Sequence, residues 1–168
     1  HHRDLHSFPT RRSSDLFCSV VEDEPDIDFI PVANEELVLI VSNEHPLAKN
    51  ESVDLTEVAS YPFIGFSEKS GIRSIIQDLF KEVNIVPNTI CEVEEDNAVA
   101  GLVEINYGIA VVPRISSLKY YNVKVLPIIN PEHERFIYLA TLKNRYLTPS
   151  VNLFKKYSLE YSKKLLNK

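Results

Sequence analysis

The sequence has little cysteine, little glycine and no long apolar run, and each shortage excludes a class of protein. Its 168 residues include 2 cysteines, Cys18 and Cys91, far apart and without other ligands at metal-binding spacing. We therefore expect reduced, mostly buried thiols and neither a disulfide nor a metal site. The 4 glycines do not fall on the spacings of a phosphate loop or a dinucleotide fingerprint. No apolar stretch approaches the roughly 18 residues of a membrane span, and we expect no cofactor.

Residue types that commonly catalyse reactions are also scarce. Beyond residue 16 the only histidines are His45, in EHPLA, and His133, in PEHER, and we expect both in exposed turns. No serine lies in a nucleophile elbow, and neither cysteine has an evident histidine partner. Carboxylates crowd residues 92–96 and could act as an acid–base pair, but a charged loop between a strand and a helix is the commoner explanation. The sequence predicts no catalytic residue and no enzyme.

The first 16 residues differ in character from the rest of the chain. They are basic and rich in serine and arginine, and they lack the apolar core of a secretory signal. The stretch HSFPTRRSSDL, from His6 to Leu16, resembles the conceptual translation of a common short-read sequencing adapter. We therefore expect residues 1–16 to be an artefactual, irregular leader, and the native sequence to start near Phe17, inside a domain.

Positive charge is in short supply once the leader is set aside. The whole chain has 18 Lys+Arg and 24 Asp+Glu, and the leader holds three arginines and two aspartates. The remainder therefore has 15 basic and 22 acidic residues, a net charge of −7. Such a surface repels phosphate, so this part of the protein is not expected to bind DNA by itself.

Beyond the leader, strands and helices are predicted to alternate, which indicates the α/β class with a mostly parallel sheet. The predicted strands are 26–32, 36–42, 62–66, 89–93, 108–112, 123–126 and 135–142. The predicted helices are 54–59, 72–83, 97–106 and a last helix from Thr148. Asp54, Asp96 and Thr148 are the expected N-caps. The last helix is expected to present one apolar face, made of Leu147, Val151, Phe154, Tyr161 and Leu165.

The stretch FSEKSGIR, residues 66–73, has two hydroxyls, a glycine and an arginine where a strand is followed by a helix. The N–H groups and the positive dipole end at a helix N-terminus favour an anion. Ser70 could cap the helix, bind a ligand, or do both. Arg73 could face the ligand, point to solvent or pair with a carboxylate.

Several segments in order resemble the effector-binding domain of LysR-type bacterial transcriptional regulators. They are ELVLIVSNEHPLAKN, YPFIGFSEKSGIR, DNAVAGLVEINYGIAVVP and the closing RFIYLATLKNRYLTPSVNLFKKY. The resemblance covers nearly everything from Phe17 onward. It implies that the family's DNA-binding domain, its linker helix and the start of the first effector lobe are missing, so that the chain is a fragment.

The resemblance implies a two-lobe fold of the periplasmic-binding-protein type (type 2). Lobe one, incomplete, would comprise 17–32 and 127–168, and lobe two would comprise 33–126. A small molecule would bind in the cleft between the lobes. The implied contacts are Cys18, Ser19, Phe66, Ser67, Ser70 and Asn97.

The resemblance implies a cytoplasmic sensor of a small effector, which reaches DNA only through the missing domain and forms homo-oligomers when full length. The helix start at Ser70 favours an anionic effector. No membrane partner is expected. A solute-binding protein of a transport system would share the fold and is the alternative; an enzyme on this fold is disfavoured because the sequence has no histidine or cysteine constellation. Because lobe one is expected to be incomplete, we expect an exposed apolar patch on this lobe, which contains the closing helix.

Overall fold

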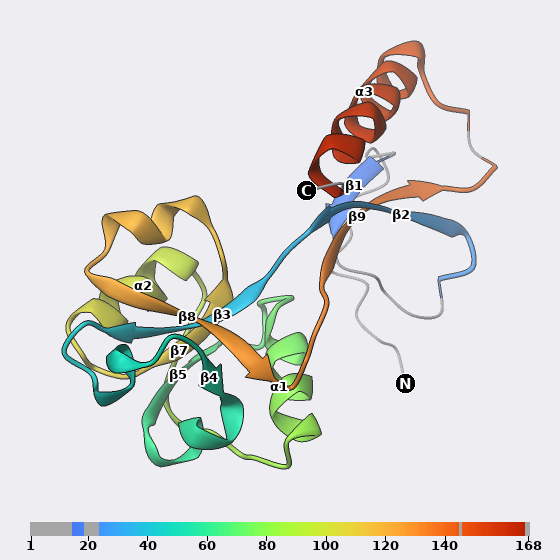
Figure 1. The fold of residues 1–168 in the computed structure, drawn as a ribbon. Coiled ribbons are helices and arrows are strands. Elements are labelled where there is room, and N and C mark those ends of the chain that lie inside the picture. The colour runs from blue at the N-terminus through green and yellow to red at the C-terminus, as the bar shows by residue number, and fades with distance from the viewer. Residues whose placement is uncertain (1–14, 19–23, 145, 167–168) are drawn as a thin grey trace. The chain divides into compact units, whose positions relative to one another are not determined.

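The computed structural model describes residues 15–18, 24–144 and 146–166. It divides into two compact units (Figure 1). Unit 1 is formed by the chain up to Asn34 together with the chain from Phe136, and unit 2 is formed by Glu35–Arg135. The sequence placed the boundaries after Val32 and Leu126; the second lies later because the strand that begins at Val123 continues to Asn130. Within the described ranges, no helix has the length and apolar character that would let it cross a bilayer.

Unit 2 is built on a mixed sheet. The strands β4 (Val53–Asp54), β8 (Val123–Asn130), β3 (Leu37–Ser42) and β7 (Ala110–Pro113) are neighbours in that order. β5 (Pro62–Phe66) and β6 (Asn88–Val93) form a parallel pair. A parallel bridge between Phe63 and Ile109 joins this pair to the β7 edge. β3 is buried along its whole length, which explains its unbroken apolar sequence.

The prediction of a mostly parallel sheet is wrong. β3 is antiparallel to both β7 and β8, and parallel pairing is confined to β4–β8, β5–β6 and the bridge at Phe63. Alternation of strands and helices does not determine strand direction. β7 and β8 lie on the two sides of β3 and run in the same direction, opposite to β3, with the short 3₁₀ helix η3 (Ser116–Tyr120) in the connection between them.

Gly108 allows the junction between β7 and β5. A Cβ atom at Gly108 would lie 2.8 Å from the carbonyl oxygen of Pro62, which is closer than real Cβ contacts. The backbone here approaches closely enough for Ile109 to donate to the Pro62 oxygen at 2.9 Å and for Ile64 to donate to the Ile109 oxygen at 2.9 Å. Glycine is the residue that permits such an approach.

The helices of unit 2 follow the predicted apolar periodicity with small shifts at their ends. α1 is Arg73–Glu82 and buries Ile76, Leu79 and Phe80. α2 is Asp96–Glu104 and lies against β3 and β7. Asn84 and Asn106 follow these helices with φ of 55° and 59°, the left-handed conformation typical of a helix C-terminus. Two further 3₁₀ helices are η1 (Pro46–Lys49) and η2 (Leu55–Ser60). Asp54 caps η2 as predicted, accepting from the Thr56 N–H at 2.8 Å.

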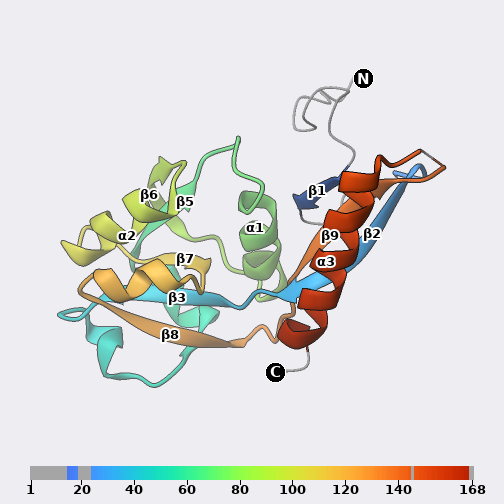
Figure 2. The same cartoon turned by 90° about the horizontal axis from the view of Figure 1, so that it is seen from above.

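Unit 1 is a three-stranded antiparallel sheet covered by one helix, as Figures 1 and 2 both show. β9 (Phe136–Leu142) lies between β1 (Asp15–Cys18) and β2 (Ile27–Asn34). α3 (Pro149–Leu166) packs on β2 and starts at the proline that the sequence places in the first helical position. The expected irregular backbone is wrong for Asp15 and Leu16, which pair with Thr141 and Ala140. The rest of the predicted leader, residues 1–14, lies outside the described residues.

The predicted apolar face of α3 is also wrong. Phe154 and Tyr161 are 49% and 52% exposed. The side of α3 that faces inward carries Val151, Lys155, Ser158, Leu159 and the buried Ser162. Phe154, Tyr161, Leu153 and Tyr157 are exposed instead, and the Phe154 ring contacts Phe17 of β1 edge-on with centroids 6.0 Å apart. An exposed apolar patch was expected on the lobe that contains this helix, and the exposed apolar residues of α3 lie in that lobe. The side chain of Leu165 lies outside the described residues.

Candidate functional site

The parallel strands β5 and β6 bring two polar loops to one edge of unit 2. β5 ends at Phe66 and β6 ends at Val93, and the chain leaves each strand toward a helix. The Ser67 N–H donates to the Val93 carbonyl oxygen at 3.0 Å, so the two strand ends are directly joined. Lys69 Nζ lies 3.5 Å from Glu94 Oε1 across the same gap. The carboxyl ends of parallel strands are where open α/β sheets bind ligands.

Ser67 contributes a hydroxyl that the folded chain does not use. Its Oγ is buried and has no hydrogen-bond partner among the residues that the structure describes. Phe66, which precedes it, is 3% exposed and belongs to the core of unit 2. Most buried polar groups are paired, because an unmade hydrogen bond costs about 1–3 kcal/mol. A buried hydroxyl without a partner at a strand end is therefore a candidate ligand contact.

Ser70 lies within a turn and does not cap the helix with its side chain. Its N–H donates to the Ser67 carbonyl oxygen at 3.0 Å, and its own carbonyl oxygen accepts from the Arg73 N–H at 3.2 Å. α1 begins only at Arg73, and its N-cap position, Ile72, makes no side-chain capping bond. The capping alternative for Ser70 is thus wrong, because the chain makes an extra turn at Gly71 and Ile72 before the helix starts.

The start of α2 differs from prediction in the same way. Glu95 holds the extended N-cap conformation without a side-chain capping bond, so Asp96 is the first helical residue and not the cap. Asn97 follows it and is exposed. Burial, and secondarily the charge of Glu95, raise the pKa of the Asp96 carboxyl above its ordinary value. Both helices at this edge therefore begin without a side chain on their first N–H groups.

Arg73 pairs with a carboxylate, which decides between the alternatives left open by the sequence. Its Nη1 lies 2.6 Å from Glu92 Oε1 and donates to the Phe66 carbonyl oxygen at 2.7 Å. The side chains of Arg73 and Glu92 are 24% and 43% exposed. Glu92 is thus a structural partner, and Arg73 fixes α1 to the ends of both parallel strands.

The remaining predicted contacts lie in or beside unit 1. Cys18 ends β1 opposite Tyr138, is half-buried, and has a thiol pKa raised by burial. Ser19 lies outside the described residues. Cys91 is likewise half-buried and unpaired, so both thiols are more accessible than expected. The structure therefore brings Phe66, Ser67, Ser70 and Asn97 together at one edge of unit 2, and this group does not include Cys18.

The expectation of an exposed turn is wrong for His45. The ring is 8% exposed, packs edge-on against Tyr61 with centroids 4.6 Å apart, and accepts the Leu47 N–H on Nδ1 at 3.2 Å. It therefore caps η1, and burial lowers its pKa below the ordinary value. His133 is half-buried, with Nδ1 3.3 Å from the Pro131 carbonyl oxygen. Across the described part of the chain, no group of three or more histidine, cysteine or carboxylate side chains could hold a metal ion.

The comparisons with known proteins identify the family of the chain. The family model of the LysR substrate binding domain matches residues 16–163. An uncharacterized HTH-type transcriptional regulator, YybE of Bacillus subtilis, is 34% identical over 146 residues, which cover 87% of this chain and 50% of that protein. The chain thus spans about half the length of the curated relatives that it matches.

Two solved structures combine similar sequence with similar fold. The effector binding domain of QuiR in complex with shikimate is 53% identical, with a TM-score of 0.85 over 90% of this chain and 72% of that chain. The BenM effector binding domain with its effector benzoate is 25% identical, with a TM-score of 0.74 over 91% of this chain and 69% of that chain. The family match covers most of the sequence and both units. The chain belongs to the LysR family of transcriptional regulators, and residues 16–163 match its substrate-binding, or effector-binding, domain.

Proposed function

We propose that this domain senses a small hydroxylated carboxylate, with shikimate as the first candidate, and that unit 2 binds it at the edge formed by Ser67, Ser70 and the start of α2. The observation that carries the proposal is the buried, unpartnered Ser67 hydroxyl. It is supported by the 53% identity to a domain whose structure was determined with shikimate. Phe66 would supply the apolar wall beside the ligand.

The electrostatics of the edge favour a carboxylate held by dipoles and hydroxyls. The nearest cations already have partners, since Arg73 pairs with Glu92 and Lys69 with Glu94. The first turns of α1 and α2 still present N–H groups that no side chain caps, and helix N-termini attract anions. Hydrogen bonds that involve a charged group are about twice as strong as neutral ones. Serine hydroxyls and backbone N–H groups can therefore hold an anion here without an unpaired arginine.

We further propose that the whole protein is a cytoplasmic, homo-oligomeric regulator. Effector binding would shift the domain between conformations that an attached DNA-binding domain distinguishes. The curated relatives carry the description HTH-type transcriptional regulator, which supports this over a transport protein.

Calorimetric titration with shikimate and with benzoate tests the proposed ligand class. We expect saturable binding of shikimate, weakened at least about fivefold by Ser70→Ala if one neutral hydrogen bond is lost. Asn97→Asp places a negative charge in the first turn of α2 and should weaken shikimate binding further. Asn88→Asp makes the same change at the other end of β6 and should leave the affinity unaltered. Equal affinities in all four proteins would remove this edge from the binding site.

A further inference from the structure

The turn that carries the two serine hydroxyls of the proposed effector edge also carries a lysine. The Ser70 N–H donates to the Ser67 carbonyl oxygen at 3.0 Å, so residues 67–70 form a tight turn with Glu68 and Lys69 at its two central positions. The first and last Cα atoms of such a turn lie within about 7 Å of each other. A ligand that contacts both serine hydroxyls is therefore within reach of the long, flexible side chain of Lys69.

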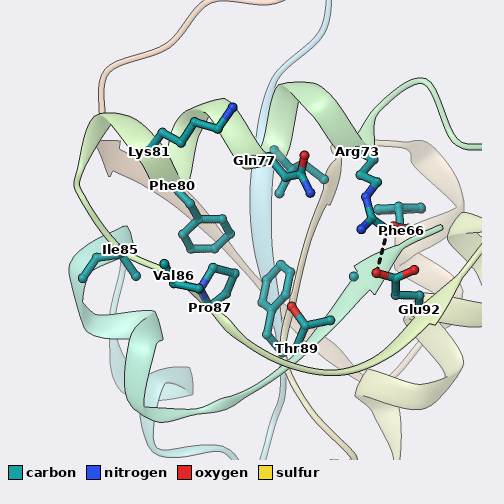
Figure 3. A pocket seen from close by; sticks show the side chains of 13 residues that line it. Phe66, Arg73, Gln77, Phe80, Lys81, Ile85, Val86, Pro87, Thr89 and Glu92 are labelled. Carbon is teal, nitrogen blue, oxygen red and sulfur yellow. Dashed lines mark hydrogen bonds and ion pairs between the residues drawn. The ribbon is translucent and has the colours of Figure 1, made fainter. Parts of the chain in front are cut away.

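The two ion pairs at this edge differ in how firmly they are held. Arg73 lies 2.6 Å from Glu92, as the dashed line in Figure 3 shows, and also donates to the Phe66 carbonyl oxygen at 2.7 Å. Lys69 and Glu94 are 3.5 Å apart, and their side chains are 86% and 59% exposed. This distance exceeds the roughly 2.7–2.9 Å of a charge-assisted hydrogen bond, and exposed pairs contribute little to stability. Lys69 can therefore leave its partner easily, whereas Arg73 is fixed by two contacts.

The surroundings of Lys69 are otherwise acidic. Within residues 67–72 and 94–97, Lys69 is the sole cationic residue, and it is outnumbered by four carboxylates: Glu68, Glu94, Glu95 and Asp96. Like charges repel an anionic ligand unless a cation faces it. A positive charge held by one weak contact is thus the group that can make this edge accept an anion.

We propose that Lys69 exchanges Glu94 for the carboxylate of the effector, so that Glu94 is a built-in competitor that lowers the affinity for anions. This inference rests on the proposed function, because it assigns the charged partner of the ligand at the same site. Without ligand, Lys69 links the loop after β5 to the loop after β6. With ligand, its ammonium group would face the bound carboxylate, and Glu94 would turn to solvent, to which it is already largely exposed. Lys69 would then select carboxylates over neutral compounds.

Calorimetric titration with shikimate tests the role of Lys69. Lys69→Met should weaken binding at least about threefold, and Lys69→Arg, which keeps the charge, should restore most of the affinity. Lys119→Met is the control. It removes the same charge from η3, which adjoins the far end of α2 through the hydrogen bond from the Asn122 N–H to Glu104. The nine residues of α2 span about 13 Å, more than the screening length of about 8 Å at physiological salt, so this control should keep the wild-type affinity.

The role of Glu94 is tested by the opposite effect. Glu94→Gln should tighten shikimate binding about two- to fivefold, whereas Glu104→Gln should leave it unaltered. The gain from Glu94→Gln should be smaller in the Lys69→Met background, which a double-mutant cycle measures. Because both side chains are exposed, the melting temperatures of these variants should match that of wild type.

Three results would overturn the exchange. Equal gains from Glu94→Gln in both backgrounds would mean that Glu94 repels the effector directly and does not compete for Lys69. A Lys69→Met variant that binds shikimate as tightly as wild type would exclude Lys69 from the site and leave the proposed function standing. A wild-type chain without saturable shikimate binding would instead remove the proposed function, and this inference with it.

Discussion

Replacing Ser67 with alanine should move the stability of the ligand-free domain and its affinity for effector in opposite directions. The Ser67 Oγ is buried and has no partner among the described residues. Such a group costs about 1–3 kcal/mol relative to a hydrogen-bonded one. Ser67→Ala removes the hydroxyl and leaves the strand end otherwise unchanged. The ligand-free variant should therefore be as stable as wild type or more stable, with a melting temperature higher by about 2–4 °C for each kcal/mol recovered.

The same substitution should weaken shikimate binding. A hydrogen bond to a charged group contributes about 1.5–3 kcal/mol, which corresponds to about a 10- to 150-fold rise in Kd. Scanning calorimetry without ligand and with saturating shikimate measures both effects. Ser74→Ala, an exposed serine on α1, is the matched control and should change neither. A Ser67→Ala variant that melts lower without ligand, or that binds shikimate as tightly as wild type, would refute the reasoning.

Three further outcomes are expected. Burial lowers the pKa of His45 in the folded chain below the ordinary value of 6.5, so the unfolded chain takes up a proton first and stability is lost as pH falls from about 7 to 5. His45→Asn keeps an acceptor for the cap of η1, and it should flatten that decline when unfolding by denaturant is measured at several pH values. The raised pKa of Asp96 means that its carboxylate destabilises the fold at neutral pH and that protonation relieves the cost; Asp96→Asn should gain stability at pH 7, and the gain should shrink as pH falls toward 4. Leu153 and Tyr157 on α3 are 70% and 66% exposed. Replacing both with lysine should reduce concentration-dependent aggregation measured by light scattering, and unchanged aggregation would mean that another surface causes it.

The strands and helices of unit 2 were predicted well from local sequence, because the spacing of apolar residues in each element matches the face that the element buries. β3 reads as an unbroken apolar run because both of its faces are covered, and α1 shows its buried face at helical spacing. The direction of neighbouring strands depends instead on the path of the chain between them. That path is long between β3 and its partners β7 and β8, so no local pattern records it.

The orientation of α3 shows a different limit. The sequence carries an aromatic stripe and a stripe of small residues, and either could face a sheet. Hydrophobicity favours the aromatic stripe, yet Phe154 lies outward and Ser162 is buried. The sheet of unit 1 has three strands, and the helix packs mainly on β2. Which stripe is buried thus depends on the shape of the partner surface, which the helix sequence alone does not contain.

One part of the candidate site can be predicted from local sequence, and another part depends on pairing between distant segments. A hydroxyl-bearing loop after a strand is visible in FSEKS, and the rule that ligands bind at the ends of parallel strands brings Asn97 to the same edge. The partner of Arg73, however, follows from the pairing register of β5 and β6. That register sets Gly65 opposite Glu92, and the Glu92 carboxylate meets the Arg73 guanidinium of α1 above it. A one-residue slip would turn Glu92 to the other face of the sheet, and it would separate the ion pair beside the hydrogen bond from Arg73 to the Phe66 carbonyl oxygen, at the base of the Ser67 loop.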